Sequence, residues 1–170
     1  MHNRNRIRYW THAAIIAALY AALTHMQNFI LPGSASWAIQ CRLSEALCVL
    51  ALFTPAAIPG LSLGCLVFNL TSAAVLPLDF LVGSLATALA ATGMWHSRQL
   101  LIGQFPLPAL LMPALWNGLI AGWELSVYIG GGFLYNAVTV AVGELAVLLT
   151  LGSALFYALH LRGLDKKLFG

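Results

Sequence analysis

Residues 133–160 read FLYNAVTVAVGELAVLLTLGSALFYALH, an apolar stretch in which Glu144 is the only Asp, Glu, Lys or Arg. A transmembrane helix needs about 20 mostly apolar residues, and this stretch exceeds that length. The whole chain has the same character, because 61% of its 170 residues are hydrophobic, 8% are charged and the mean hydropathy is +0.87. Soluble domains carry roughly 25% charged residues. The sequence therefore predicts an all-α integral membrane protein with little chain left for a soluble domain.

Proline, glycine and charged residues divide the chain into six apolar segments. The expected helices are Trp10–Leu31, Leu43–Phe53, Ala56–Leu76, Asp79–Trp95, Leu107–Ile129 and Phe133–His160. The second is short, since it covers about 16 Å as an α-helix against a hydrocarbon core of roughly 30 Å. It is either re-entrant or begins earlier, near Trp37.

Basic residues at both ends of the chain set its expected orientation. The arm 1–9 carries three arginines, and the tail 161–170 carries one arginine and two lysines. Because short positively charged segments stay in the cytoplasm, both termini are expected there. That requires an even number of crossings, so we expect 1–170 to be a single domain of six transmembrane helices in the plasma membrane. Basic residues at the ends do not form the patch that binding of nucleic acid needs.

Polar residues gather in the half of the helices that this topology places outside. Ionisable groups within membrane helices cost about 2.5 to 3.5 kcal/mol each, and they usually line a cavity or meet a partner. Helix geometry brings residues seven or eight apart near one face, and residues three apart are neighbours. Three such pairs could converge on one outward-facing pocket: Arg42 with Glu45, Asn117 with Glu124, and Asn136 with Glu144.

A structural explanation of these residues stays open. Arg42 would neutralise Glu45 at the interface, Glu124 would extend outward, and the asparagines would hydrogen-bond between helices. This structural explanation does not account for Glu144, because a buried carboxylate needs a hydrogen-bond donor. Trp116 is the aromatic candidate for stacking on a planar ligand, although tryptophan also favours membrane interfaces.

Small residues recur at every fourth position of the first helix. They form two interleaved sets, Ala13, Ala17 and Ala21, and Ala14, Ala18 and Ala22. Small residues at this spacing let another helix approach closely within lipid. The pattern fits the docking of a partner helix, and it equally fits packing against the protein's own helices.

Residues 39–69, IQCRLSEALCVLALFTPAAIPGLSLGCLVFN, resemble the QueT family of substrate-binding (S) components of energy-coupling factor vitamin transporters. The resemblance rests on Gln40, Arg42, Ser44 and Glu45 with the PAAIPG turn and the LGC after it. Weaker similarity continues through GSLATALAA and VGE. It implies a six-helix S component with both termini cytoplasmic. It also implies docking, through the Ala-rich first helix, on a membrane scaffold subunit driven by two cytoplasmic ATPases.

The resemblance implies import of queuosine precursors, the 7-deazaguanines queuine, preQ1 and preQ0. A carboxylate such as Glu144 or Glu45 would accept two N–H groups of the deazaguanine edge, and Arg, Asn or Gln would donate to its carbonyl. Glu124 would suit a side chain that carries an amine. The expected substrate contacts are Gln40, Arg42, Glu45, Trp116, Asn117, Glu124, Asn136 and Glu144.

Motifs of metal binding are missing from the sequence, and it has no H-E-x-x-H, no C-x-x-C and only dispersed histidines. Residues 60–64, GLSLG, match G-x-S-x-G, but they lie inside an expected membrane helix and not at the strand-to-helix turn that presents a catalytic serine. We therefore expect neither an enzyme nor a cofactor. Two alternatives remain: an S component for another vitamin or nucleobase, and a membrane assembly subunit without solute binding.

Overall fold

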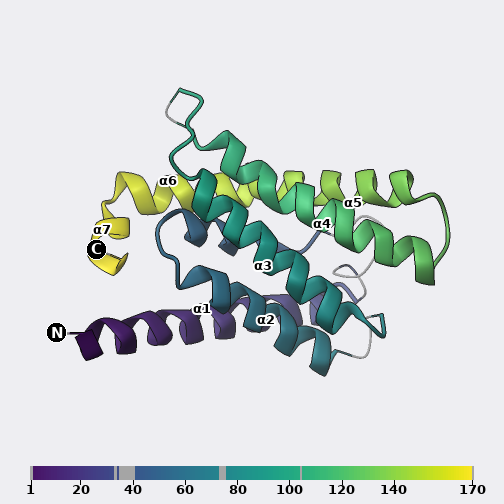
Figure 1. The fold of residues 1–170 in the computed structure, drawn as a ribbon, viewed down its shortest axis with the longest axis horizontal. Coiled ribbons are helices and arrows are strands. Elements are labelled where there is room, and N and C mark those ends of the chain that lie inside the picture. Colours follow the sequence, from purple (N-terminus) through teal and green to yellow (C-terminus); the bar gives the residue numbers. More distant parts are fainter. Residues whose placement is uncertain (1, 33, 35–40, 73–75, 104, 170) are drawn as a thin grey trace.

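The computed structural model describes residues 2–32, 34, 41–72, 76–103 and 105–169 (Figure 1). Its helices are α1 His2–Ile30, η1 Leu43–Leu52, α2 Ala57–Thr71, α3 Asp79–Ser97, α4 Leu107–Tyr128, α5 Phe133–Val147, η2 Leu148–Gly152, α6 Ser153–Leu161 and α7 Leu164–Phe169. The expected all-helical fold is confirmed. In the described part of the chain, β-pairing is limited to an isolated bridge between Ile102 and Phe105.

The helices form a bundle around η1. Neighbours in the sequence pack together, with α2 between α1 and α3, and α4 between α3 and α5. The short helix η1 contacts α1, α2, α3, α4, α5, η2 and α6, so it forms the centre of the bundle. The chain begins and ends at the same end of the bundle (Figure 1).

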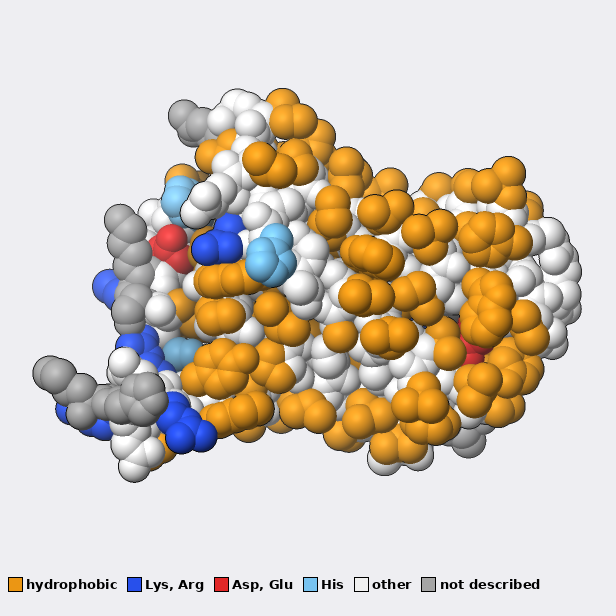
Figure 2. Space-filling model, viewed as in Figure 1, with side chains coloured by type: hydrophobic (Ala, Val, Ile, Leu, Met, Phe, Trp, Pro, Cys, Tyr) orange, Lys and Arg blue, Asp and Glu red, His pale blue; other side chains and the backbone are white. Residues whose placement is uncertain are grey.

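The outer surface of the bundle is apolar. Leu81, Leu134 and Val142 are among many large hydrophobic side chains that are more than half exposed. Hydrophobic atoms cover the middle of the face in Figure 2, whereas Lys and Arg gather near the end that holds the termini. Two described helices, Asn3–Ile30 and Phe133–Leu161, have the length and hydropathy of a membrane span. Large contiguous apolar surfaces are rare on soluble monomers, so contact with membrane lipid explains the apolar surface of this bundle.

Three expected helices differ from the structure, and one of them, α2, ends at Thr71 and not at Leu76, because the backbone of Ser72 is extended. The first begins at His2 rather than Trp10, because no proline or glycine interrupts residues 2–9, so the basic arm is the first two turns of α1. The second, η1, is a 3₁₀-helix of 10 residues. At about 2.0 Å per residue it extends about 20 Å and is still shorter than the roughly 30 Å core. Its alternative start near Trp37 lies outside the described residues.

Glycines of α2 allow α1 to approach closely. A Cβ atom at Gly60 would lie 2.8 Å from the carbonyl oxygen of Ala13. At Gly64 it would lie 2.7 Å from the Cβ of Tyr20 and 2.8 Å from the carbonyl oxygen of Ala17. Such close approach is the usual role of small residues between membrane helices.

The two alanine sets of α1 therefore have different surroundings. The set on the side of α2 is buried or half-buried, and comprises Ala13, Ala17 and Ala21. The other set is exposed along its length, and comprises Ala14, Ala18 and Ala22. Internal packing thus accounts for the first set, and only the second, here called the exposed alanine face, is free to meet a partner.

We expect the substitution Gly64→Ala to destabilise the protein by about 1 to 3 kcal/mol, because the added methyl group meets backbone and Cβ atoms that cannot rotate away. Gly93→Ala is the matched control within α3, since its nearest atoms belong to the flexible side chain of Met112, at 3.0 Å and beyond. Thermal unfolding of the detergent-purified variants measures the difference. Equal unfolding temperatures for the two variants would contradict the tight α1–α2 contact.

Candidate functional site

Buried polar side chains are grouped around the start of η1. Several of them come from the ends of α1 and α2 and the start of α3, which lie at the end of the bundle opposite the termini (Figure 1). We call them the polar cluster: Thr24, Gln27, Arg42, Ser44, Glu45, Asn69, Asp79, Asn117, Glu124 and Glu144. They come from α1, η1 and the residue before it, α2, α3, α4 and α5. Burying so many polar groups is costly unless they are hydrogen-bonded or take part in function.

Arg42 forms its ion pair with Asp79. Its Nη2 lies 3.5 Å from Oδ2 of Asp79, with both side chains buried, and its Nη1 lies 3.8 Å from Sγ of Cys65. Asn69 donates from Nδ2 to the backbone carbonyl of Asp79 at 2.7 Å. These contacts hold together the end of α2, the start of α3 and the entry to η1. Neutralisation of Arg42 by Glu45 is therefore not needed to explain the buried guanidinium.

Both oxygens of Glu45 accept hydrogen bonds from the protein itself. The Tyr20 hydroxyl donates to Oε1, and the Cys48 thiol donates to Oε2 at 3.0 Å. Glu45 and Cys48 are three residues apart, a spacing that places them one above the other in a 3₁₀-helix. Beside them, the Thr24 hydroxyl donates to Oγ of Ser44 at 2.7 Å. Glu45 thus joins η1 to α1 and has less free acceptor capacity than an unpaired carboxylate.

Gln27 fixes the backbone that leads into η1. Its Nε2 donates to the Cys41 carbonyl at 2.6 Å and to the Ser34 hydroxyl at 3.0 Å. Its Oε1 accepts from the Leu43 amide at 2.7 Å. One side chain of α1 therefore satisfies backbone groups on both sides of Arg42, which holds that residue in place.

Glu144 differs from Glu45 because one of its oxygens lacks a donor. Asn117 donates from Nδ2 to Oε1 of Glu144 at 2.9 Å. Within the described residues Oε2 of Glu144, Oε1 of Glu124 and Oδ1 of Asn69 are buried without a hydrogen-bond partner. Buried acceptors usually have partners, so these three atoms are acceptors to which N–H groups could still donate.

Carboxyl groups outnumber basic groups in the cluster. Buried charged side chains in the described part of the chain are four carboxylates and one guanidinium, those of Glu45, Asp79, Glu124, Glu144 and Arg42. The carboxyl of Glu144 lies within the electrostatic influence of Glu45 and Arg42, and that of Glu124 within that of Asp79 and Arg42. Residues from four helical segments thus share one polar centre, which favours ligands that bring N–H donors or a positive charge.

The chain matches the family described as QueT transporter over residues 10–161. It belongs to the QueT transporter family. The matched range includes the whole polar cluster and leaves out only the first turns of α1 and the end with α7. No curated protein and no solved structure matches the chain. Family membership confirms the resemblance seen in the sequence and makes this QueT protein a membrane transport protein.

The structure brings some of the expected site residues of this QueT protein together. Asn117 and Glu144 meet across α4 and α5, whereas the sequence paired each with another residue of its own helix. Asn136 is buried but donates to the Gly130 carbonyl at 3.0 Å, in the loop between α4 and α5. Trp116 is half-buried, and Gln40 lies outside the described residues. Ligand contacts of these residues stay predictions.

Three residues important to the QueT centre were absent from the expected set. Asp79 is an isolated acid at the start of an apolar helix, and Tyr20 and Gln27 are polar positions in the Ala-rich α1. The opposite charges of Asp79 and Arg42 were a usable signal, but sequence alone does not say which acid lies within reach. In the described residues no group of three His, Cys, Asp or Glu side chains is arranged to hold a metal ion.

Proposed function

We propose that this QueT protein is the substrate-binding component of an energy-coupling factor importer, and that it captures a 7-deazaguanine queuosine precursor from outside the cell. The observation that carries this proposal is the buried Glu144, oriented by Asn117 and with one oxygen unpartnered. In this proposal the bundle crosses the plasma membrane six times. Its basic ends lie in the cytoplasm, in keeping with the common position of the termini (Figure 1).

A deazaguanine fits the chemistry of Glu144. Its pyrimidine edge presents two parallel N–H donors, and a carboxylate accepts such a pair with both oxygens. Each carboxylate oxygen has two acceptor positions, so Oε1 can accept from the ligand as well as from Asn117. Asn117 itself would stay in place, and the flat ring would lie near Trp116 on the same helix. Glu45 is less suitable, because Tyr20 and Cys48 already donate to it.

The excess of carboxylates favours precursors with a basic amine. Queuine and preQ1 carry an amine on the side chain of the deazaguanine, whereas preQ0 carries an uncharged nitrile. The unpartnered oxygen of Glu124 would accept a hydrogen bond from a protonated amine, and charge-assisted hydrogen bonds are about twice as strong as neutral ones. We therefore propose that the amine-bearing precursors are the preferred substrates.

Transport in this proposal needs partner proteins. The sequence contains no nucleotide-binding motif, so ATP hydrolysis must be supplied by other subunits. The exposed alanine face of α1 is the surface on which a membrane scaffold subunit, joined to two cytoplasmic ATPases, would dock. This assignment leaves Ala13, Ala17 and Ala21 to the contact with α2 described above.

We expect calorimetric titration and thermal-shift assays of the detergent-purified protein to show saturable binding of queuine, preQ1 and preQ0. A ligand at 100 times its Kd should stabilise the protein by about 2.7 kcal/mol. Thiamine, riboflavin and biotin serve as controls and should give no saturable signal. Binding of one of these vitamins instead would identify an S component for another solute. No binding of any compound would favour the assembly subunit.

A further inference from the structure

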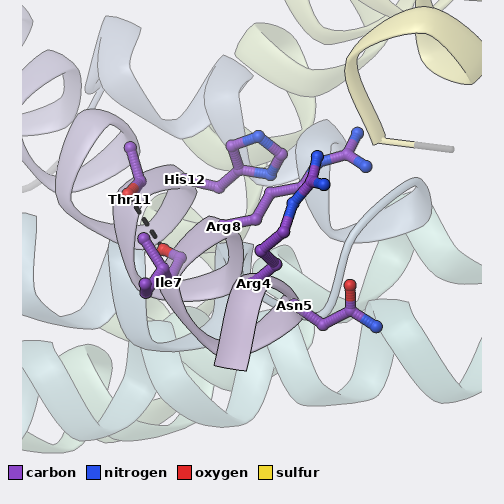
Figure 3. A pocket seen from close by; sticks show the side chains of 6 residues that line it. All are labelled: Arg4, Asn5, Ile7, Arg8, Thr11 and His12. Carbon is purple, nitrogen blue, oxygen red and sulfur yellow. Dashed lines mark hydrogen bonds between the residues drawn. The ribbon is translucent and has the colours of Figure 1, made fainter. Parts of the chain in front are cut away.

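A second group of polar side chains lies at the opposite end of the molecule from the polar cluster. A hollow of about 580 Å³ on the first turns of α1 is lined by Arg4, Asn5, Ile7, Arg8, Thr11 and His12. Figure 3 shows the side chains of Arg4 and Arg8 extending toward the same side of the helix as His12. Their spacing of four residues explains this, because such residues lie on one helix face.

The surroundings of the two arginines contain few acidic groups in the described part of the chain. Among the described residues, neither Arg4 nor Arg8 forms an ion pair with a carboxylate. Arg8 donates from Nη2 to the carbonyl of Leu168 in α7 at 2.8 Å, which fixes its guanidinium and leaves its other N–H groups available. Two like charges four residues apart on a helix destabilise it. An anion between them would remove that repulsion.

A second hollow adjoins the first and shares Ile7 and Thr11 with it. Asn3 and Arg6 line its end near the N-terminus, and the part toward the middle of the bundle is apolar, along Trp10, Ala14 and Ile15. Trp10 is more than half exposed, and tryptophan favours the boundary between hydrocarbon and headgroups. Along the helix axis Arg8 and Arg4 lie about 3 and 9 Å beyond Trp10. The headgroup layer extends about 5 to 7 Å beyond the hydrocarbon, so the backbone of Arg8 lies within it and that of Arg4 about 2 to 4 Å outside it. The long side chain of Arg4 can span that distance to reach lipid phosphates.

We propose that this face of α1 binds an anionic phospholipid. Arg4 and Arg8, with His12 beside them, contact the phosphodiester of the headgroup, and an acyl chain follows the hollow along Trp10 and Ile15, beside the exposed alanine face. The charge and the adjoining apolar path together select a lipid over a soluble phosphate, which has no chain to bury. The site is separate from substrate capture, since it lies at the other end of the bundle.

Retention of lipid tests the site. The purified protein is exposed to vesicles containing equal amounts of phosphatidylglycerol and phosphatidylcholine, washed in detergent and analysed for bound lipid by native mass spectrometry. We expect selective retention of phosphatidylglycerol. The double substitution Arg4→Gln and Arg8→Gln should lower it by about tenfold or more, because each basic residue near an anionic lipid surface contributes roughly fivefold in affinity.

The matched control removes two basic charges from the same end of the chain, with Arg162→Gln and Lys167→Gln. It should lower retention far less than the Arg4 and Arg8 substitutions. Arg4→Gln alone preserves the contact of Arg8 with α7 and should still reduce retention, which separates lost binding from misfolding. An equal loss of lipid retention in the control would overturn the site, because it would show a general attraction between basic residues and anionic lipid. Displacement of the lipid by glycerol phosphate at similar concentration would assign the hollow to a soluble phosphate instead.

Discussion

Replacing Glu144 by glutamine is expected to weaken binding of a 7-deazaguanine by about 10 to 100-fold, since a hydrogen bond to a charged group contributes about 1.5 to 3 kcal/mol. The substitution keeps the size of the side chain but replaces one acceptor with a donor. That donor would face the N–H groups of the ligand edge. Calorimetric titration of the purified variant measures the change in Kd.

Glu124→Gln is the comparison, and we expect a smaller loss of affinity. Both carboxylates are buried, but Glu144 is held by Asn117, whereas Glu124 lies one turn from the C-terminal end of α4, where water competes more. The loss at Glu124 should also be confined to precursors with an amine and leave the nitrile precursor unaffected. These separate roles would be refuted if the two variants had equal dissociation constants and if each lost the same affinity for precursors with and without an amine.

The second large effect concerns the exposed alanine face. Replacing Ala18 and Ala22 by leucine is expected to reduce uptake of a deazaguanine by cells to the background level, while the purified protein binds the solute as before. Both side chains point away from the bundle, so added bulk does not reach the polar cluster. It would instead hold a docked helix away from α1, and close approach is what small residues provide. Radiolabelled uptake and calorimetry measure the two properties separately.

A matched variant replaces Ala146 and Ala154, which are exposed on α5 and α6, with leucine. It adds the same bulk to the apolar surface and should leave uptake intact. Loss of solute binding together with uptake in the α1 variant would mean that these alanines support the fold. Unchanged uptake would place the partner on another surface.

Sequence determined the helical segments and their membrane character. Hydropathy depends on local composition, so the ends of α3, α4 and the long helix Phe133–Leu161 agree with expectation within two residues or so. Family membership also followed from a continuous stretch, residues 39–69, which needs no knowledge of contacts. The grouping of polar residues toward one end of the bundle was similarly readable, because depth along a helix is a simple count of residues.

Tertiary structure alone decided which polar groups meet. Arg42 pairs with Asp79, and Glu45 is satisfied by Tyr20 and Cys48, since these contacts depend on how the helices rotate and cross. The same rotation turns one alanine set of α1 toward the glycines of α2 and leaves the other exposed. A sequence period defines the faces of a helix but not the neighbour that each face contacts, because the neighbour is set by packing between segments distant in the chain.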